Sequence, residues 1–564
     1  MTSHKLLIAN RGEIAMRIIS SCKDLGISTV ALAQKSEIDA PFAQAADTCL
    51  VFEGQSLQES YLNTEEILKM AKKAGASMLH PGYGFLSENA DFAQAVNDAG
   101  IIFLGPSPLC MRILGDKISA RALAQRLNLP LAKGSNGVLK DDELFILARE
   151  LGFPLAIKAA AGGGGRGLRV VRDIDSLEAM YKEAKREAKA AFGNDDCFME
   201  QYLEEPRHIE VQVLGDLHGN IKILGTRDCS LQRRNQKLVE EAPAPFLAPS
   251  EIELIKDAAY KICKELNYHS AGTVEFLRSK TGLISFLEVN TRLQVEHPVS
   301  EEAGGFDLVA WQIKVALGHK LDIDTNTKAH AIEFRIVAED PAMGFLPSSG
   351  LITSFNPPSG LGIRLDSGVI TGSKVLANFD GLIAKLIVKG KDRPEAIARA
   401  KRAISQFQIQ GLATTLPLFK ALLEQEDFIS QKELRINTRW LDSKDLKTEL
   451  NLARQPNLGS SQSYFSTSIE LDGRVVKLTL PEVLAPKQEL EQEAEESELK
   501  APLSGTLISW QVAEGDSVKL DQVVAIMSAM KTEFTLHAHK EGRIRMLVEP
   551  SSSIEDGRAL ALIE

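Results

Sequence analysis

The sequence predicts a multidomain protein of α/β and α+β domains that ends in a small all-β domain. Residues 1 to about 115 alternate apolar, strand-like runs with helical patterns, which favours an open and mostly parallel α/β layer. Residues 116 to about 325 form a longer α+β region. From about residue 501 the chain contains only short runs with strand periodicity, separated by turns that contain glycine. The length of 564 residues is enough for about four domains.

Each part of the chain has its own pattern. In the first domain we expect the strands Leu6–Ile8, Thr29–Leu32, Met78–His80 and Ile101–Leu104 and the helix Glu13–Leu25. The first loop lacks the three-glycine fingerprint of a dinucleotide site. Residues 326–445 mix strands such as Ala331–Val337 with a helix, Arg393–Gln406. Residues 446–484 form a short β connecting segment with a hairpin turn at Asp472–Gly473.

Residues 485–500 differ in composition from their surroundings. They are rich in Pro, Glu and Gln, and eight of the sixteen are charged. Such a segment cannot bury apolar surface, so we expect an acidic, flexible linker that spans up to roughly 50 Å when extended.

The overall charge limits the classes of partner. Lys and Arg number 65 and Asp and Glu number 76, so the net charge is −11, which argues against nucleic acid as the main partner. The six cysteines lack the close spacing of a disulfide framework or a zinc site. No apolar run reaches membrane-spanning length, and the chain enters its first strand without a signal or transit peptide pattern. We therefore expect a cytoplasmic protein with no membrane partner.

The final domain, residues 501–564, consists of two similar halves. Residues 505–526 and 542–563 repeat one pattern of strands and turns at an offset of 36 to 37 residues, which indicates a duplication. Lys531 lies between the halves, where a hairpin tip is expected. This is the setting of a lysine whose amine carries a covalently attached cofactor. An ordinary exposed lysine on a turn is the alternative.

A glycine-rich segment indicates phosphate binding. Residues 162–165 and 167 are glycines, and they lie between the apolar strands Leu155–Ile157 and Leu168–Val171. Glycines let backbone N–H groups approach phosphate oxygens, and they let a loop close as a lid. The segment is not a GxxxxGK[ST] loop, because it leads into a strand. A linker without a ligand is the alternative.

Two carboxylates and an amide form a candidate cation site. If a hairpin turns near Thr281–Gly282, Glu275 pairs across the ladder with Glu288, and Asn290 shares the face of Glu288. Oxygen ligands of this kind suit Mg²⁺ held against nucleotide phosphates. A solvated strand face is the alternative.

The next run, Asn290–Pro298, concentrates reactive side chains. Arg292 could clamp a small oxyanion through two hydrogen bonds, and Glu296 is a candidate general base. Residues 227–237 add further cations. We interpret His297 as a structural turn residue and Cys229 as a buried thiol.

Five runs carry a resemblance to a known family. They are Ile8–Ala15, His80–Asn89, Gly162–Gly167, Asn290–Pro298 and Glu333–Asp340. Together they resemble the biotin carboxylase component of biotin-dependent carboxylases, over residues 1 to about 445. The resemblance implies an N-terminal domain (1–115), an ATP-grasp domain with a glycine-rich lid (116–325) and a biotin carboxylase C-terminal domain (326–445).

Residues 501–564 resemble the all-β biotinyl carrier domain of the same enzymes, a hammerhead fold. The family signature is Ala-Met-Lys-Met-Glu; Met530 and Glu533 match it, whereas Thr532 follows the lysine here. Lipoyl domains share the duplicated fold but usually flank their lysine with Asp and Ala or Val, so biotin is favoured over lipoate.

The resemblance implies a role for each matched residue. ATP would be held by Lys117, Lys158, Gly163, Gly164, Gly165, Glu200, Leu203 and His208. The metal, Mg²⁺ or alternatively Mn²⁺, would be held by Glu275, Glu288 and Asn290. Bicarbonate would be held by Lys237, Arg292, Gln294 and Val295, with Glu296 as the base. Tyr83 and Gly84 would contact biotin, Arg335 would stabilise the biotin enolate, and Lys531 would be biotinylated. The catalytic group is thus Glu296, Arg335, Lys237 and Arg292.

Two residues depart from the family pattern. Asn235 stands where the family often has His, and Phe334 replaces a common Cys. Neither change alters a charged catalytic group.

The resemblance implies ATP- and bicarbonate-dependent carboxylation of biotin, as in the α subunit of an acyl-CoA carboxylase. We expect a separate carboxyltransferase (β) subunit, because the chain shows no such domain. We also expect a biotin protein ligase as a partner, and a homo-oligomer through the biotin carboxylase part. The alternatives are an acceptor of the pyruvate or urea type, a non-enzymatic biotin carrier or scaffold, and an ATP-grasp ligase serving a lipoyl arm.

Overall fold

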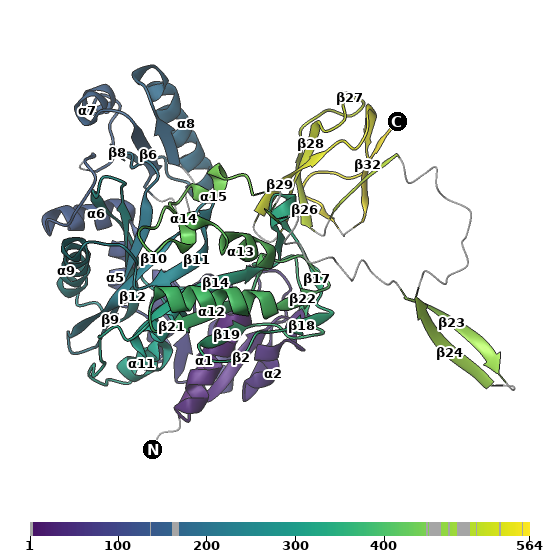
Figure 1. Cartoon of the computed structure of the whole chain (residues 1–564), viewed down its shortest axis with the longest axis horizontal. Helices are drawn as coiled ribbons and strands as arrows, with labels where there is room; N and C mark the ends of the chain where they lie inside the picture. The colour runs from purple at the N-terminus through teal and green to yellow at the C-terminus, as the bar shows by residue number, and fades with distance from the viewer. Residues whose placement is uncertain are drawn as a thin grey trace.

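The computed structural model describes residues 4–135, 137–160, 168–446, 449–450, 464–471, 474–481, 497–502, 505–529, 532–554 and 557–564 (Figure 1). Four predictions fall outside these residues: the glycine lid, the Asp472–Gly473 turn, most of the acidic linker and Lys531.

The N-terminal region is the predicted parallel α/β layer. Its five strands are ordered β3-β2-β1-β4-β5 and all pair in parallel. Both faces of the sheet are covered by apolar side chains, as parallel sheets require. The strands are β1 Lys5–Ile8, β2 Ser28–Ala33, β3 Thr48–Val51, β4 Met78–His80 and β5 Ile102–Phe103. The helices are α1 Gly12–Asp24, α2 Pro41–Ala45, α3 Thr64–Ala74, α4 Ala90–Asp98 and α5 Pro108–Gly115.

A small antiparallel sheet, ordered β7-β6-β8, carries the two strands that flank the glycine segment. Buried apolar residues join it to α7 and α8 (Figure 1). The elements here are α6 Lys117–Arg126, α7 Leu144–Leu151, β6 Leu155–Ala159, β7 Leu168–Val171, α8 Ile174–Phe192 and β8 Cys197–Gln201.

The largest sheet has eight antiparallel strands in the order β13-β12-β9-β10-β11-β14-β21-β19. Helices α9 and α12 cover one face, over two apolar clusters. The predicted helix Arg393–Gln406 is α12, and Asp392 caps it by accepting the backbone N–H of Glu395. The strands are β9 Arg207–Gly215, β10 Ile221–Arg233, β11 Gln236–Ala242, β12 Ser270–Arg278, β13 Ile284–Asn290, β14 His330–Val337, β19 Ile363–Ser367 and β21 Leu382–Gly390. The helices around the sheet are α9 Pro249–Glu265, α10 His297–Gly304 and α11 Leu308–Ala316.

Short elements complete this part of the chain. The strands are β15 Glu339–Asp340, β16 Leu346–Pro347, β17 Gly350–Leu351, β18 Ser354–Asn356, β20 Lys374–Val375 and β22 Gln408–Gln410. The helices are α13 Leu416–Leu422, α14 Glu426–Ile429 and α15 Trp440–Ser443. In the connecting segment, β23 Tyr464–Leu471 and β24 Arg474–Pro481 form an antiparallel pair that begins four residues before the first pairing residue we expected, Ser468.

The final domain shows the predicted duplication. It has two four-stranded sheets, β25-β32-β30-β27 and β29-β28-β26-β31, so each sheet combines strands of both halves. The strands are β25 Glu498–Lys500, β26 Gly505–Trp510, β27 Ser517–Val518, β28 Val523–Ala529, β29 Thr532–His537, β30 Gly542–Met546, β31 Ser553–Ile554 and β32 Ala559–Ile563. Pairing of β28 with β29 extends to Ala529 and Thr532, on either side of the lysine position.

One sequence prediction needs correction. Residues 498–500 were expected in the flexible linker, but they form β25 and pair with β32. Leu499 is the reason, since its side chain is buried in the apolar core of the final domain. Among the described residues, no helix is long and apolar enough to cross a membrane.

Candidate active site

The polar face of the eight-stranded sheet carries most of the predicted site residues. Strand β9 shows how this face arises. Ile209, Val211 and Val213 point into the apolar core. His208, Glu210 and Gln212 alternate with them and are also buried, so their polar groups need partners. Neighbouring strands supply those partners.

Lys237, on β11, is the centre of the site. Its ammonium group donates hydrogen bonds to Glu210, to Glu275 Oε1 at 3.0 Å and to Glu296 Oε1 at 2.8 Å. Three carboxylates around one ammonium group raise the pKa of Lys237 well above its usual value despite burial. The lysine is therefore held as a cation between the predicted metal site and the predicted base.

The predicted carboxylate pair is confirmed in register, because Glu275 on β12 lies opposite Glu288 on β13. Asn290 Nδ2 and Gln294 Nε2 donate to Glu275 Oε1 at 2.7 and 3.0 Å, and His208 Nε2 lies 2.8 Å from Glu275 Oε2. Burial and the neighbouring Glu275 raise the pKa of Glu288. Glu275 thus disfavours ionisation of the facing Glu288, and a divalent cation between the two carboxylates would offset this repulsion.

Arg292 links the predicted cation and oxyanion residues. Its guanidinium group donates to Asn290 Oδ1 and to Gln294 Oε1, both at 3.1 Å. It also forms an ion pair with Glu88 at 3.0 Å. The predicted bicarbonate residues Lys237, Arg292 and Gln294 are thus connected through hydrogen bonds around Glu275.

Glu296 is fully buried and bridges two cations. Its Oε1 accepts from Lys237, and its Oε2 accepts from Arg335 at 2.9 Å. Burial opposes ionisation of Glu296, but Lys237, Arg335 and Arg227 hold its pKa below the usual value. Arg335 also donates to Glu240 at 2.6 Å. Burial raises the pKa of Glu240 to about 7, although Arg335 opposes the shift.

Most of the predicted nucleotide residues lie toward the small sheet, whereas His208 lies on β9 beside Glu275. Lys158 on β6 forms an ion pair with Glu200 on β8, and Arg121 holds the second oxygen of Glu200 at 2.7 Å. Lys117 is the first residue of α6, and burial lowers its pKa. Lys117, Lys158 and Glu200 are thus brought together. Leu203 lies just after β8, and the lid glycines 163–165 lie outside the described residues.

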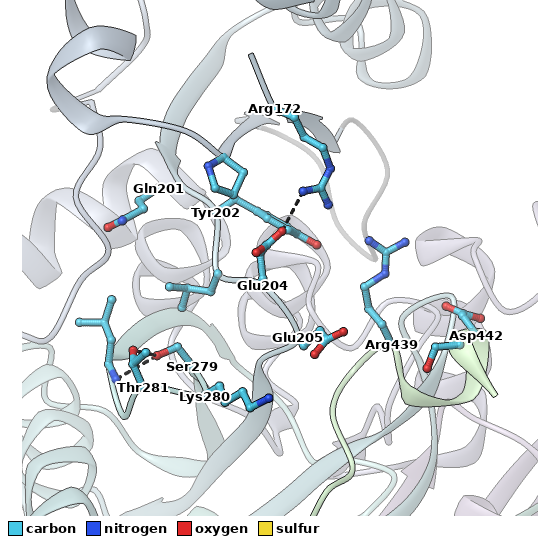
Figure 2. Close-up of a pocket in the computed structure, with 14 residues that line it drawn as sticks. Arg172, Gln201, Tyr202, Glu204, Glu205, Ser279, Lys280, Thr281, Arg439 and Asp442 are labelled. Carbon is cyan, nitrogen blue, oxygen red and sulfur yellow. Dashed lines mark hydrogen bonds and ion pairs between the residues drawn. The ribbon is translucent and has the colours of Figure 1, made fainter. Parts of the chain in front are cut away.

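A cavity of about 700 Å³ opens beside Leu203 (Figure 2). Its walls come from the end of β8, the β12–β13 turn and α15. Arg172 pairs with Glu204 at 2.8 Å on one side, and Arg439 lies across from them. Gln201, the last residue of β8, lines the cavity, whereas Glu200, Lys158 and Lys117 do not.

The predicted biotin residues Tyr83 and Gly84 lie in the loop after β4, and the Tyr83 hydroxyl donates to Glu13. Val295 is held through its carbonyl oxygen, which accepts from Lys385 at 2.9 Å. Lys531 lies outside the described residues.

Four residues outside the predicted catalytic set are explained by the structure. Asn235 occupies the β10–β11 turn at φ 66°, a left-handed conformation that Asn tolerates. Phe334 points into the core, where it packs on Phe419 at a ring distance of 5.2 Å. His297 is buried at the start of α10, and its Nδ1 lies 2.7 Å from the carbonyl of Gln294, which is a structural role. Burial raises the pKa of the Cys229 thiol well above its usual value, so this cysteine is a poor nucleophile.

Several residues beside the site received no individual role from the sequence: Glu13, Glu210, Glu240, Lys385, Arg227 and Gln232, whose side chain lies 2.8 Å from His208 Nδ1. Arg227 was expected only as one of the cations of residues 227–237. Alternation of polar and apolar residues along β9 was an available signal for Glu210. Arg227 is fully buried and donates to Glu210, Gln212, Thr273 and Ser300. Its partners lie 15 to 73 residues away, so no local pattern indicates them.

Family models match most of the chain. They are "Biotin carboxylase, N-terminal domain" at residues 2–111, "Carbamoyl-phosphate synthase L chain, ATP binding domain" at 116–324, "Biotin carboxylase C-terminal domain" at 333–443 and "Biotin-requiring enzyme" at 497–563. Fold and site together define an ATP-grasp enzyme with a carrier domain.

Individual relatives agree. The chain is 46% identical to the biotin-dependent acyl-coenzyme A carboxylase alpha3 subunit of Mycobacterium leprae, over 99% of this chain and 98% of that protein. It is 46% identical to biotin carboxylase 1 of Bacillus subtilis, over 78% of this chain and 99% of that protein. A crystal structure of the biotin carboxylase domain dimer of Hydrogenobacter thermophilus 2-oxoglutarate carboxylase, with MgADP, ADP and bicarbonate, matches with a TM-score of 0.75 and 43% identity, over 79% of this chain and 98% of that chain.

The chain belongs to the biotin-dependent carboxylases, as a biotin carboxylase fused to a biotin carrier domain. This result confirms the predicted fold class and the predicted enzyme class, an ATP-dependent ligase.

Proposed function

We propose that this chain carboxylates biotin on its own carrier domain and serves as the α subunit of an acyl-CoA carboxylase. The observation that carries the carboxylation site is the bridge at Glu296, which joins Lys237 to Arg335. One carboxylate thereby contacts both the bicarbonate residues and the residue assigned to biotin, so a proton can be accepted where the two substrates meet.

The residues would divide the work as follows. The nucleotide would be bound by Lys117, Lys158, Glu200, Leu203, His208 and the lid glycines. Bicarbonate would be bound by Lys237, Arg292, Gln294 and Val295. A Mg²⁺ or Mn²⁺ ion at Glu275, Glu288 and Asn290, when bound, neutralises charge on the phosphates. Biotin on Lys531, when attached by a biotin protein ligase, supplies the nitrogen that accepts the carboxyl group.

Glu296 would take the proton of bicarbonate onto its carboxylate. A bicarbonate oxygen then bonds to the γ-phosphorus of ATP while the bond to the ADP oxygen breaks. Lys237 and Arg292 offset the negative charge that gathers on the transferring group. Arg335 would orient the ureido group of biotin and balance its charge, and Tyr83 and Gly84 would contact the biotin ring.

The acceptor assignment rests on alignment along the whole chain. The acyl-coenzyme A carboxylase alpha3 subunit matches through the connecting segment and the carrier domain as well as the catalytic part. The 2-oxoglutarate carboxylase small subunit of Hydrogenobacter thermophilus matches over 78% of this chain and 93% of its own length. We propose a separate carboxyltransferase subunit on the same ground, and a homo-oligomer through the catalytic part, since that part is a dimer in the Hydrogenobacter structure.

Two measurements test this function. The full chain should hydrolyse ATP in the presence of bicarbonate, and free biotin should accelerate the reaction; absence of both would refute the carboxylase role. The biotinylated chain, combined with its carboxyltransferase, should then fix labelled bicarbonate into an acid-stable product with acetyl-CoA or propionyl-CoA. Fixation with pyruvate, 2-oxoglutarate or urea instead would refute the acyl-CoA assignment alone.

A further inference from the structure

Lys385 is a buried cation beside the site, and none of the substrate-binding roles proposed above is assigned to it. It lies on β21, opposite Arg335 of β14 and Asp366 of β19, and its side chain is 0% exposed. A buried charge is costly unless it is paired and hydrogen-bonded, so its partners define its role.

The ammonium group of Lys385 has two polar partners from distant parts of the chain. It forms an ion pair with Glu13 Oε1 at 3.1 Å, at the start of α1. It also donates to the carbonyl oxygen of Val295 at 2.9 Å, in the loop before α10. One ammonium group therefore holds the N-terminal layer against the loop assigned to bicarbonate.

Glu13 passes this constraint to Tyr83. The Tyr83 hydroxyl donates to the same oxygen, Glu13 Oε1, and the Lys385 ammonium lies 5.8 Å from the centre of the Tyr83 ring. That distance is within the range of a cation–π interaction. Burial raises the pKa of Glu13 to about 7, which Lys385 opposes and Asp366 reinforces.

The backbone around Tyr83 is held by Asn10, which lies in the same loop as Glu13. Asn10 Nδ2 donates to the carbonyls of Pro81 and Tyr83 at 2.8 and 2.7 Å. A Cβ atom on Gly82 would lie 2.7 Å from that Asn10 nitrogen, so the close approach requires glycine. The loop of residues 9–13 thus holds the loop that carries Tyr83, through Asn10 and Glu13.

We propose that Lys385 and Glu13 are positioning residues that fix Tyr83 and the Val295 loop relative to one another, so that the biotin and bicarbonate sites are ordered together. The inference rests on the proposed function, because Tyr83 and Val295 take their roles from it.

The test uses the full-length chain with Lys531→Arg, so that free biotin is the sole biotin present. KM values for biotin, bicarbonate and ATP are measured together with the melting temperature. Lys385→Met should raise the KM for biotin and for bicarbonate by about tenfold each, the effect of losing about 1.4 kcal/mol, and should change the KM for ATP less than twofold. An equal rise in all three KM values would overturn the proposal.

A double variant separates positioning from stability. Glu13→Gln with Lys385→Met removes both charges of this ion pair, so neither partner is left buried and unpaired, and it should recover the melting temperature that either single change loses. Its KM for bicarbonate should stay raised, because the Val295 carbonyl still lacks its donor. Recovery of that KM together with the melting temperature would show a purely structural role. The double variant also serves if Lys385→Met alone does not fold.

Two further variants complete the test. Tyr83→Phe should raise the KM for biotin only, and adding Glu13→Gln to it should raise that KM no further; an additive rise would overturn the link through Glu13. Arg393→Met removes a buried cation that pairs with Glu241 outside the site. It should lower the melting temperature and leave all three KM values unchanged, and a change in the KM for biotin would show that lost stability alone mimics the effect. A parent chain that lacks biotin-stimulated ATP hydrolysis would refute the proposed function, a result distinct from these.

Discussion

Glu296 and Arg335, which are 39 residues apart in the sequence, form a hydrogen bond in which Arg335 Nη2 lies 2.9 Å from Glu296 Oε2. Glu296 precedes α10, whereas Arg335 lies in the middle of β14. The contact places the candidate base Glu296 against Arg335, the residue proposed to bind biotin, and the other carboxylate oxygen of Glu296 accepts a hydrogen bond from Lys237.

Replacing Glu296 by Ala is expected to reduce bicarbonate-dependent turnover by about 10² to 10⁴, the usual loss with one general base. The KM for ATP should change little, because Lys158 and Glu200 lie in the small sheet and His208 contacts Glu275 rather than Glu296. Steady-state kinetics with free biotin measure both values. Glu301→Gln, in the helix α10 that follows Glu296, is a matched control, since Glu301 is buried but pairs with Arg17 and Arg364 outside the site. Near-normal turnover of Glu296→Ala would assign the proton to another group.

Glu288→Gln is expected to raise the Mg²⁺ concentration for half-maximal rate by about tenfold or more, because even an outer partner of a metal site contributes this much. Titration of the ATPase rate with Mg²⁺ measures the shift. Glu251→Gln, which removes the partner of Arg278 beside the same hairpin, should leave the requirement unchanged. An unaltered requirement in Glu288→Gln would remove Glu288 from the metal site.

Lys531→Arg is expected to abolish avidin binding after treatment with a biotin protein ligase. Lys531 alone combines a place between the duplicated halves with the signature neighbours Met530 and Glu533, whereas Lys540, which also lies between the halves, lacks these neighbours. Intact mass should show the loss of one biotin. ATP hydrolysis stimulated by free biotin should persist, because the catalytic residues are elsewhere. Continued avidin binding would assign the modification to a different lysine.

Glu241 is expected to control stability in acid. Burial opposes its ionisation, but Arg393 and His330 lower its pKa to about 2. A carboxyl with a lowered folded-state pKa adds stability above its unfolded pKa of about 4.5, and that stability is lost as the pH falls toward 2. The difference between the unfolded and folded pKa values of Glu241 corresponds to about 3 kcal/mol in the free energy of unfolding at neutral pH.

Melting temperatures between pH 7 and pH 3 test this expectation. Glu241→Gln should melt lower at pH 7 and should lose less stability on acidification than the parent chain. Glu150→Gln, an exposed carboxylate, is the control and should follow the parent. Parallel curves for Glu241→Gln and the parent would contradict the assignment.

The acidic segment is expected to act as a tether. Replacing residues 487–496 by a Gly/Ser sequence of equal length should preserve carboxylation of free biotin and most of the acceptor reaction. Deleting them should impair transfer to the acceptor far more, because only transfer needs reach. Equal loss of both activities would show that the segment supports the catalytic part.

The sequence predicted those features that depend on short-range patterns. Helix α12, the parallel layer and the duplicated carrier domain follow from periodicity and turn residues. The pairing of Glu275 with Glu288 followed from one hairpin turn. The Glu13–Tyr83–Lys385 group could not be predicted, because its members lie 70 and about 300 residues apart and meet only through packing. Leu499 was misassigned since a single apolar residue carries little signal within a charged run.

Residue 325 was expected to separate the ATP-grasp domain from the C-terminal domain, but one eight-stranded sheet contains strands from both sides of it. Strand β11 forms its outer ladder with β14, so main-chain hydrogen bonds run without a break from β13 to β19. A fragment ending at residue 325 would keep Lys237 and lose Arg335. It would present β11 as a bare edge and keep only Leu231, Leu238 and Val239 of the apolar core cluster next to that edge. Unpaired edges of that kind recruit other chains. A truncated form of the catalytic part should therefore keep all eight strands of this sheet and end after α15.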